Sequence, residues 1–220
     1  MDSKIVSREL WKAIRPMLKE AGWTSFTSRT ARRFFDSRVE VINFQSLNSY
    51  SASVFGCTTY SFSIRLGCFL RGIPYPVVKI KDGLLMPEEY SCHLRRTLLK
   101  KFSQPECERS EVFYVDSDGR YLATVTEAAR DGIAKQAFEW FQRFSDMQEV
   151  LRTLLEDDET MDGTWGFGRI TSPARHLCRG YVALSLGDTK LAVKDLTCVA
   201  SSPCYAELRE RIESDLARMS

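Results

Sequence analysis

Apolar residues near the N-terminus recur with the spacing of one helical face, which predicts a helix over residues 7–21. The residues on this stripe are Leu10, Ile14, Met17, Leu18 and Ala21. Pro16 lies inside the stretch and removes one backbone donor, which predicts a kink or a late start. Gly22 is placed to end the helix.

Three following stretches are rich in β-branched and aromatic residues and predict strands. They are residues 30–36 (TARRFFD), 39–46 (VEVINFQS) and 58–70 (TTYSFSIRLGCFL). The second is apolar on both sides, as expected of a central strand. In the third, apolar residues alternate with a polar set that includes Ser61, Ser63 and Arg65, which predicts a half-buried antiparallel strand with a polar side.

Weaker patterns lie between and after these stretches. The uncharged residues 47–57 predict either a mobile solvated loop or an adaptable contact loop. The proline-containing residues 73–89 predict a loop with one short strand. Residues 92–102 predict a short helix, because Leu94, Leu98 and Phe102 are spaced by four. Residues 111–123, with a turn at Asp118-Gly119, predict a hairpin at a sheet edge.

The chain becomes helical from residue 124. Capping boxes at 124–127 and 145–148 precede long apolar faces, Ser172-Pro173 forms a good helix start, and Asp188 and Pro203 open further helices. Strands that come first and helices that come later predict an α+β fold. We therefore expect a single domain over residues 1–220, with a small antiparallel sheet packed against helices (1–123) and a C-terminal helical group (124–220).

Composition adds that the chain is an ordinary folded one, with 220 residues, 44% of them hydrophobic and 27% charged. These values exclude a collagen, a disulfide miniprotein, a disordered chain and a polytopic membrane protein. Residues 1–105 hold 17 Lys and Arg against 8 Asp and Glu, whereas residues 106–165 hold 6 against 15. The basic half attracts a polyanion, or the acidic helices neutralise it; both interpretations stay open.

The N-terminus has charges every few residues and lacks the apolar core of a signal peptide. No apolar run approaches the roughly 20 residues that cross a bilayer. The seven cysteines are an odd number without a repeating spacing, which is typical of reduced, mostly buried thiols. The sequence thus predicts a cytoplasmic protein that does not contact a membrane.

Common catalytic and cofactor motifs are missing from the sequence. It holds no GxxxxGK[ST] loop and no GxSxG elbow, and Gly166-Phe167-Gly168 lacks the third glycine of a dinucleotide loop. Two histidines and no Cys-x-x-Cys do not suit a zinc site. We therefore predict no cofactor and no metal.

Two sets of residues remain as candidates for function. His93 follows Cys92 and precedes Arg95 and Arg96, so it is either a hydrogen-bonded structural histidine or an acid–base catalyst beside an anion clamp. Asn43, Gln45 and Arg65 share one sheet face if the second and third strands are neighbours. Buried polar groups need hydrogen bonds, so this set either forms a closed network, is simply exposed, or forms a binding surface for a ligand.

An ordered set of motifs resembles a known family. It runs Gly22-Trp23, Phe34-Phe35, Val41 to Gln45 (VINFQ), Ile64 to Gly67 (IRLG), Cys92 to Arg96 (CHLRR) and Trp140 to Asp146. The chain resembles the bacterial proteins grouped as domain of unknown function 4304. Arg65 stands where that family commonly has Asn, so a shared ligand contact there is not implied. The resemblance implies a shared fold and a bacterial source, and the family has no established activity.

A smaller similarity lies near the C-terminus. Gly180, Gly187, Ala192, Leu196 and Pro203 are spaced as in one tetratricopeptide-like helical hairpin. A single such hairpin does not form a solenoid, which needs about three repeats. We interpret it as a packed appendage.

These observations predict a cytoplasmic bacterial protein that binds or interacts without catalysis. Its partner would be another protein, or, as a less favoured option, nucleic acid or another polyanion. The binding surface would use the polar sheet face, residues 48–57 and the basic surface of Arg95, Arg96 and Lys100. The alternative is an enzyme or nucleic-acid-linked factor that acts on an anionic substrate, with His93 as acid–base group and Arg65, Arg95 and Arg96 as clamps.

Overall fold

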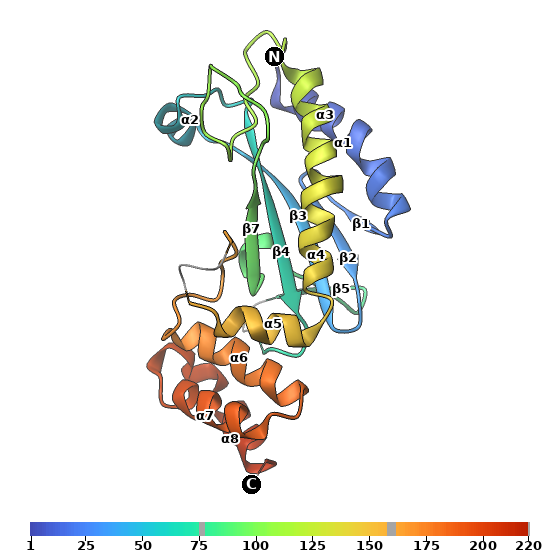
Figure 1. The fold of residues 1–220 in the computed structure, drawn as a ribbon. Helices are drawn as coiled ribbons and strands as arrows, with labels where there is room; N and C mark the ends of the chain where they lie inside the picture. The colour runs from blue at the N-terminus through green and yellow to red at the C-terminus, as the bar shows by residue number, and fades with distance from the viewer. Residues whose placement is uncertain (75–77, 158–161, 220) are drawn as a thin grey trace. The chain divides into compact units, whose positions relative to one another are not determined.

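The computed structural model describes residues 1–74, 78–157 and 162–219 (Figure 1). It confirms the α+β fold, with a five-stranded antiparallel sheet, helices, and a C-terminal group of helices. The chain divides into two compact units. The first comprises Met1–Phe34, Glu40–Gly67 and Arg96–Phe141, and the second comprises Phe35–Val39, Cys68–Arg95 and Gln142–Ser220. The prediction that residues 1–220 form a single domain stays a prediction.

The large sheet has the strand order β1-β2-β3-β4-β7. Its strands are β1 (Ser25–Phe26), β2 (Thr30–Phe34), β3 (Arg38–Ser46), β4 (Phe62–Leu70) and β7 (Leu94–Leu98). A separate antiparallel pair joins β5 (Lys79–Lys81) to β6 (Leu84–Met86). Asp82 and Gly83 connect these two strands with positive φ values of 50° and 75°, as the tight turns of hairpins require. This hairpin falls within residues 73–89, predicted as a loop with one strand; residues 75–77 lie outside the described residues.

The third predicted strand is more buried than its sequence indicates. Every residue of β4 except Arg65 is buried, including Ser63 and Gly67 on the side predicted to be polar and exposed. The prediction of a half-buried strand is therefore wrong. β4 lies between β3 and β7 in the sheet, and both of its faces are covered.

Two further predictions are wrong because short elements carry ambiguous patterns. Residues 92–102 do not form a helix; β7 occupies Leu94–Leu98, and a spacing of four places residues on one side of a strand as well as of a helix. Residues 47–57 are not a loop; they contain the helix α2 (Ser49–Phe55). The Asn48 side chain accepts a hydrogen bond from Ser51 N at 2.7 Å at its start, and Gly56 ends it at φ 65°.

The hairpin predicted over residues 111–123 is also wrong. Phe113 forms an isolated antiparallel bridge with Phe62, and their two backbone hydrogen bonds measure 2.9 and 3.2 Å. The next helix, α3 (Leu122–Gly132), begins before the predicted capping box at residue 124, and Tyr121 precedes it without a side-chain cap. The pairing of Phe113 with Phe62 therefore does not extend into a strand, and the chain continues into α3 instead of returning as a second strand.

In the first unit, helices cover one face of the sheet. The helix α1 (Ser3–Glu20) packs on α3 and buries the predicted apolar stripe through Leu10, Ile14 and Leu18 (Figure 1). Trp11 of α1 contacts Phe44 of β3, with ring centroids 5.0 Å apart. The even-numbered residues at this end of β3 therefore point toward the helices. The odd-numbered ones, which include Asn43 and Gln45, point to the opposite face.

A π-helical segment keeps the apolar face of the next helices aligned. It spans η2 (Ile133–Ala137) between α3 and α4 (Phe138–Arg143), and Phe138 N donates to Ile133 O. Four residues rotate the chain by more than one full turn in an α-helix, but by less than one full turn in the wider π-helix. The two deviations therefore offset each other. Ala129, Ile133, Ala137 and Phe141, each four residues apart, therefore all stay fully buried.

The second unit contains the C-terminal helical group (Figure 1). Its helices are α5 (Met147–Leu155), α6 (Pro173–Ser185), α7 (Thr189–Ala200) and α8 (Arg209–Ala217), with the 3₁₀ turns η1 (Glu89–Ser91) and η4 (Pro203–Leu208). Ser172 and Asp188 cap α6 and α7 as predicted. α5, α6, α7 and α8 pack consecutively, each against the next.

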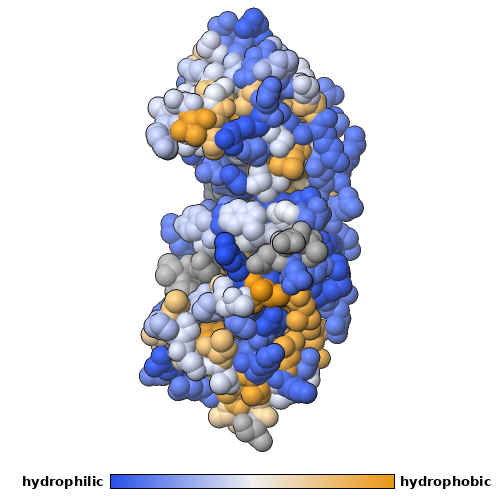
Figure 2. All heavy atoms as spheres, turned by 60° about the vertical axis from the view of Figure 1, so that its left-hand side comes forward, coloured by the Kyte–Doolittle hydropathy of each residue, from blue (hydrophilic) through white to orange (hydrophobic). Residues whose placement is uncertain are grey.

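Hydrophilic residues dominate the upper part of the molecular face shown in Figure 2, whereas hydrophobic residues cover more of its lower part. Most large apolar side chains of the described chain are buried, as the composition predicts.

Gly180 provides a test of the α6–α7 packing. A Cβ at this position would lie 2.7 Å from Leu196 Cδ2, and Leu196 is fully buried. Overpacking costs roughly 1–3 kcal/mol, against a gain of about 1 kcal/mol in helix propensity. We expect Gly180→Ala to lower the free energy of unfolding by about 1 kcal/mol in urea titrations.

Gly72→Ala is the matched control, because a Cβ there meets nothing within 4 Å. Its free energy of unfolding should stay within about 0.5 kcal/mol of wild type. Equal stabilities of the two variants would contradict the close approach of α6 and α7.

Candidate functional site

The polar sheet face predicted from Asn43, Gln45 and Arg65 is present and internally bonded. Arg65 Nε donates to Gln45 Oε1 at 3.3 Å, and Arg65 Nη1 donates to the Thr97 hydroxyl of β7. Asn43 Nδ2 donates to Thr30 Oγ1 at 3.0 Å on β2. The candidates thus lie in two separate hydrogen-bonded sets, and Gln45 is exposed, so bonds within the sheet account for them without a ligand.

His93 is buried and hydrogen-bonded. Its Nδ1 accepts from Leu70 N at 3.0 Å, and its ring lies 4.7 Å from that of Phe69. Burial lowers the pKa of His93 to about 3, so the imidazole is neutral at physiological pH. An acid–base catalyst needs a pKa near the working pH, so these surroundings favour the structural role.

The basic residues Arg95, Arg96 and Lys100 do not form one surface. Arg95 is paired with Glu89 through two hydrogen bonds of 2.8 and 2.9 Å. Neighbouring residues of a strand point to opposite sides, so Arg96 does not accompany Arg95. The Lys100 ammonium is turned inward, where it donates to Cys107 O at 2.5 Å and Gln104 Oε1 at 3.3 Å.

A buried ion pair between α6 and α7 was not identified from the sequence. Arg179 Nη2 and His176 Nδ1 lie 2.8 and 2.9 Å from Asp195 Oδ1. Burial raises the pKa of the Asp195 carboxyl, but the hydrogen bonds from Arg179 and His176 outweigh it and hold the pKa below its ordinary value. The pairing of His176 with a residue 19 positions away had no local signal.

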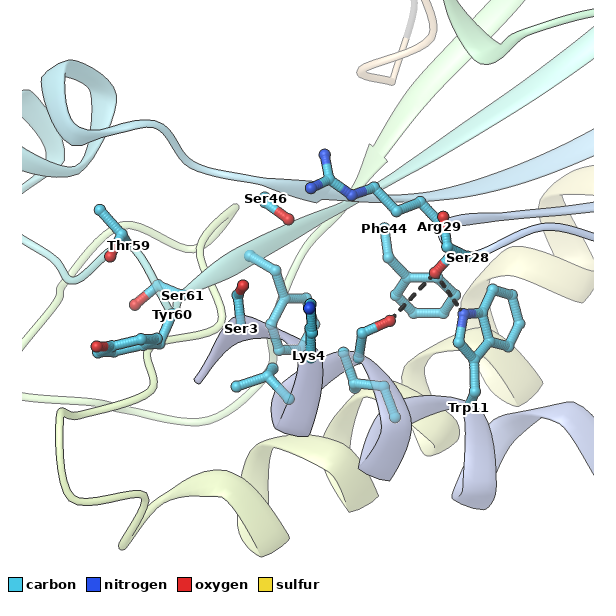
Figure 3. Close-up of a pocket in the computed structure, with 14 residues that line it drawn as sticks. Ser3, Lys4, Trp11, Ser28, Arg29, Phe44, Ser46, Thr59, Tyr60 and Ser61 are labelled. Carbon is cyan, nitrogen blue, oxygen red and sulfur yellow. Dashed lines mark hydrogen bonds between the residues drawn. The ribbon is translucent and has the colours of Figure 1, made fainter. Parts of the chain in front are cut away.

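The first unit contains a cleft of about 180 Å³ beside α1 (Figure 3). Four segments line it: the first turns of α1, the β1–β2 turn, the end of β3 and the residues before β4. The Ser28 carbonyl accepts from Trp11 Nε1 at 2.7 Å and from Ser7 Oγ at 3.1 Å, which ties the turn to α1 (Figure 3). The Arg29 carbonyl accepts from Phe44 N at 2.8 Å, which fixes the backbone of the same turn against β3.

The floor of this cleft is aromatic. Trp11, Phe44 and Phe62 line it, and Phe62 stacks on Phe113 with centroids 5.3 Å apart and planes 5° from parallel. Phe44 touches both Trp11 and Phe62, with centroids at 5.0 and 6.4 Å. This continuous row gives the cleft a rigid, apolar base.

The rim of the cleft is positive and rich in hydroxyl groups. Lys4 and Arg29 are the charged residues among those described that line it. Within the described part of the chain, neither of their side chains makes an ion pair or a hydrogen bond. The nearby Asp2 carboxylate caps α1 by accepting from Lys4 N at 2.9 Å. Ser3, Ser46, Thr59 and Tyr60 add hydroxyl-bearing side chains to the lining (Figure 3).

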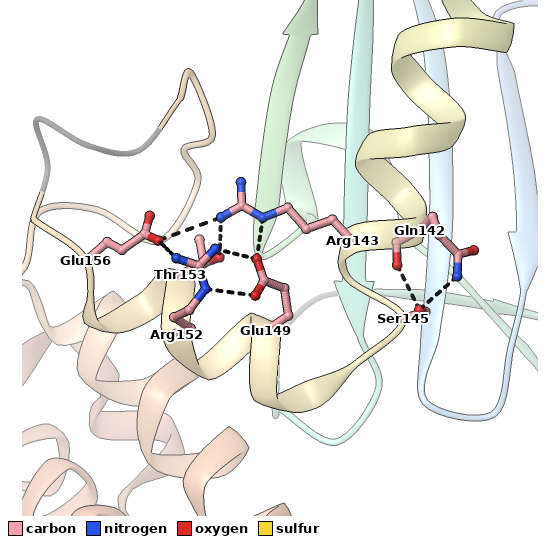
Figure 4. A network of polar contacts seen from close by, with 7 residues as sticks. All are labelled: Gln142, Arg143, Ser145, Glu149, Arg152, Thr153 and Glu156. Carbon is pink, nitrogen blue, oxygen red and sulfur yellow. Dashed lines mark hydrogen bonds and ion pairs between the residues drawn. The ribbon is translucent and has the colours of Figure 1, made fainter.

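A polar network in the second unit, unlike the rim of the cleft, consists of charged side chains that pair with one another. Arg143 Nε donates to Glu149 Oε1 at 2.7 Å and Arg143 Nη2 to Thr153 Oγ1 at 3.0 Å, which fixes the start of α5 (Figure 4). Arg152 Nε donates to Glu149 Oε2 at 2.8 Å. Hydrogen bonds from Arg152 and Arg143 lower the pKa of Glu149 to about 2. All these charges are compensated locally, unlike those of the cleft.

Other chemistry receives no support from the described residues. They contain no group of three or more His, Cys, Asp and Glu side chains that could hold a metal ion. None of the helices in the described ranges combines the length and the apolarity needed to cross a membrane.

No family model, curated protein or solved structure matches this chain. The resemblance to the domain of unknown function 4304 family, the tetratricopeptide-like hairpin and the bacterial source therefore stay predictions that rest on their motifs. The cleft is assigned from its own geometry.

His93 predicts a measurable pH dependence of stability. Its folded-state pKa of about 3 lies below its ordinary value near 6.5, so the unfolded chain binds a proton that the folded chain does not. This contribution to stability is present above pH 6.5 and is lost as the pH falls toward 3. Between pH 7 and pH 5 we expect the wild type to lose about 2 kcal/mol more than His93→Asn in urea titrations.

Asn provides a neutral acceptor near the position of Nδ1 for Leu70 N, so this variant isolates the titration. Parallel pH profiles of the two proteins would show that His93 becomes protonated without unfolding the chain.

Proposed function

We propose that the protein is a non-catalytic interaction module whose first unit binds an anionic group of a partner protein. One observation carries this proposal: Lys4 and Arg29 stand over an aromatic-floored cleft without a carboxylate partner among the described residues. By contrast, the buried cations Lys100, Arg175 and Arg179 donate to carbonyl groups or to Asp195. Two uncompensated cations at a concave site favour a negatively charged ligand.

The size of the cleft indicates what it accepts. A volume of about 180 Å³ is below the roughly 300–1,000 Å³ of pockets that bury a drug-sized ligand, so it suits one side chain or chain end. A wider hollow of about 510 Å³ shares Ser3, Arg29, Ser46, Thr59 and Tyr60 with it and is also lined by Asn48 and by Asp2, whose carboxylate caps α1. An anionic side chain in the cleft could therefore belong to an extended segment lying along this hollow.

The residues divide the recognition between them. Lys4 offers a mobile point charge, and Arg29 offers a planar donor fork that matches a carboxylate or phosphate. The hydroxyls of Ser3, Ser46 and Thr59 supply neutral donors, and Phe44 and Phe62 contact the apolar part of the bound group. The described residues that line the cleft include no His, Cys or carboxylate that would activate one of these hydroxyl groups as a nucleophile, so the site favours binding without catalysis. The alternative of an enzyme that uses His93 has no comparable observation in its favour.

The test is a binding assay on a peptide array in which acidic and phosphorylated peptides are matched to Gln and Ser counterparts. We expect the full chain to prefer the anionic members, and Lys4→Ala/Arg29→Ala to weaken the best of them about tenfold, since two exposed charge pairs contribute roughly 1–2 kcal/mol together. Added salt should weaken binding further by screening.

Lys12→Ala/Lys101→Ala is the matched control, because it removes two exposed lysine charges from the same unit outside the cleft. Its affinity should stay within about twofold of wild type. The proposal fails if anionic and neutral peptides bind alike, or if the two double variants lose the same affinity.

A further inference from the structure

The cleft and the wider hollow beside it carry charges of opposite sign. Lys4 and Arg29 line the cleft, whereas Asp2 lines the hollow, and Arg29 belongs to both linings. Asp2 is the one acidic residue in the two linings as far as the described chain forms them. A site with charges of both signs can distinguish between segments that all contain an anion.

The residues that the two cavities share show how the hollow joins the cleft. Trp11 and Ser28 lie at one end of the cleft, and Thr59 and Tyr60 lie at the other (Figure 3). Thr59 and Tyr60 also line the hollow, whereas Trp11 and Ser28 do not. The hollow therefore continues from the end of the cleft that lies away from Trp11.

Helix α1 sets the order of the charges along this path. Lys4, Ser7 and Trp11 line the cleft together, because spacings of three and four residues place them on one face of the helix. Asp2 is the N-cap of the same helix and precedes all three. At a rise of roughly 1.5 Å per residue, the stretch from Asp2 to Trp11 spans about 14 Å along the axis.

The Asp2 carboxylate can accept a bound group. Its Oδ1 accepts from Lys4 N at 2.9 Å and caps α1. A carboxylate has two acceptor oxygens, and the exposed Asp2 side chain leaves the second one open to a ligand. The N-terminus of a helix carries roughly half a positive charge, so it offsets the charge of Asp2 only in part.

The charges of Asp2, Lys4 and Arg29 do not neutralise one another. None of the three side chains forms an ion pair within the described part of the chain. For Lys4 the reason is its position two residues after Asp2, a spacing that places two side chains on different sides of a helix. Both signs of charge therefore stay available along one continuous lining.

We infer that the bound partner segment carries a basic residue near its anionic group, so that its cation reaches Asp2 while its anion reaches Lys4 and Arg29. This inference rests on the proposed function, because it concerns the same site. The partner is then a protein segment with charges of both signs and not a uniformly acidic one. Asp2 determines this specificity by attracting the cation and by repelling a second anion.

The length of the site indicates how far apart the two charges of the segment lie. An extended chain advances roughly 3.3 Å per residue, so side chains two to four positions apart are separated by roughly 7–13 Å. This separation fits within the path from Asp2 to Trp11. We therefore expect the basic residue about two to four positions from the anionic one.

The test measures how an arginine changes the affinity of anionic peptides for the full chain. Glycine–serine peptides carry one phosphoserine and, one to six positions away on either side, an arginine or a glutamine. Their binding is followed by fluorescence anisotropy. We expect arginine to strengthen binding about two- to fivefold over glutamine at the favoured spacings, as one exposed charge pair does. Added salt should reduce this gain.

Asp2→Asn isolates the charge, because asparagine caps helices as well as aspartate does. The gain from arginine should disappear in this variant, while the glutamine peptides should bind at least as tightly as they bind to wild type. Asp2→Ser, which introduces another capping side chain, should give the same result. Agreement between the two variants separates the charge from the start of α1.

Glu20→Gln is the matched control. It removes an exposed carboxylate at the opposite end of α1, outside both cavities. The gain from arginine should persist in this variant.

Several results would overturn the inference. They are equal affinities of the arginine and glutamine peptides, an arginine gain that is the same at every spacing, a gain that persists in Asp2→Asn, and a larger gain from a second phosphoserine than from arginine. Each of them leaves the proposed function intact, because anionic peptides still bind. If no anionic peptide binds, the proposed function and this inference both fail.

Discussion

The cost of burying charge organises both units of this protein. A buried ion destabilises the fold unless other groups replace the water that it loses. Glu40 is fully buried and is held by Arg33, with an ion-pair distance of 2.6 Å. Asp195 is held by Arg179 and His176, and Arg175 by backbone carbonyls. Buried ions of the described chain thus have compensating partners. The cations Lys4 and Arg29 at the rim of the cleft lack such partners among the described residues, and this difference supports the proposed anion-binding site.

The same constraint explains why residues that are close in sequence do not make a site. His93, Arg95 and Arg96 look like a catalytic group with two anion clamps when read along the chain. In the structure, Arg95 pairs with Glu89, and the buried, neutral His93 accepts a hydrogen bond from Leu70 N. Their chemistry is used to build the fold. The cleft instead gathers short segments whose residues are ordinary when taken one at a time.

Long elements with a clear periodicity could therefore be predicted from the sequence. Short elements, and sites built from segments that are distant in the sequence, could not. The apolar stripe of α1, the locations of the strands β2 to β4 and the caps of α6 and α7 agree with their patterns, although β4 is buried on both sides. β7 was mistaken for a helix, because with five residues its spacing fits both structures. α2 was mistaken for a loop, although Asn48 and Gly56 are good helix boundaries. The cleft required knowledge of which strands are neighbours, and no local pattern supplies that.

Adjacent residues in the loop of residues 164–168 (TWGFG) are constrained in different ways. The indole of Trp165 is 40% exposed, so a different side chain there changes the surface of the loop while the backbone stays in place. At Gly166 any side chain would collide with the carbonyl of His93 on the neighbouring strand. Residue 165 therefore tolerates different side chains, whereas position 166 is restricted to glycine by the backbone of its neighbour.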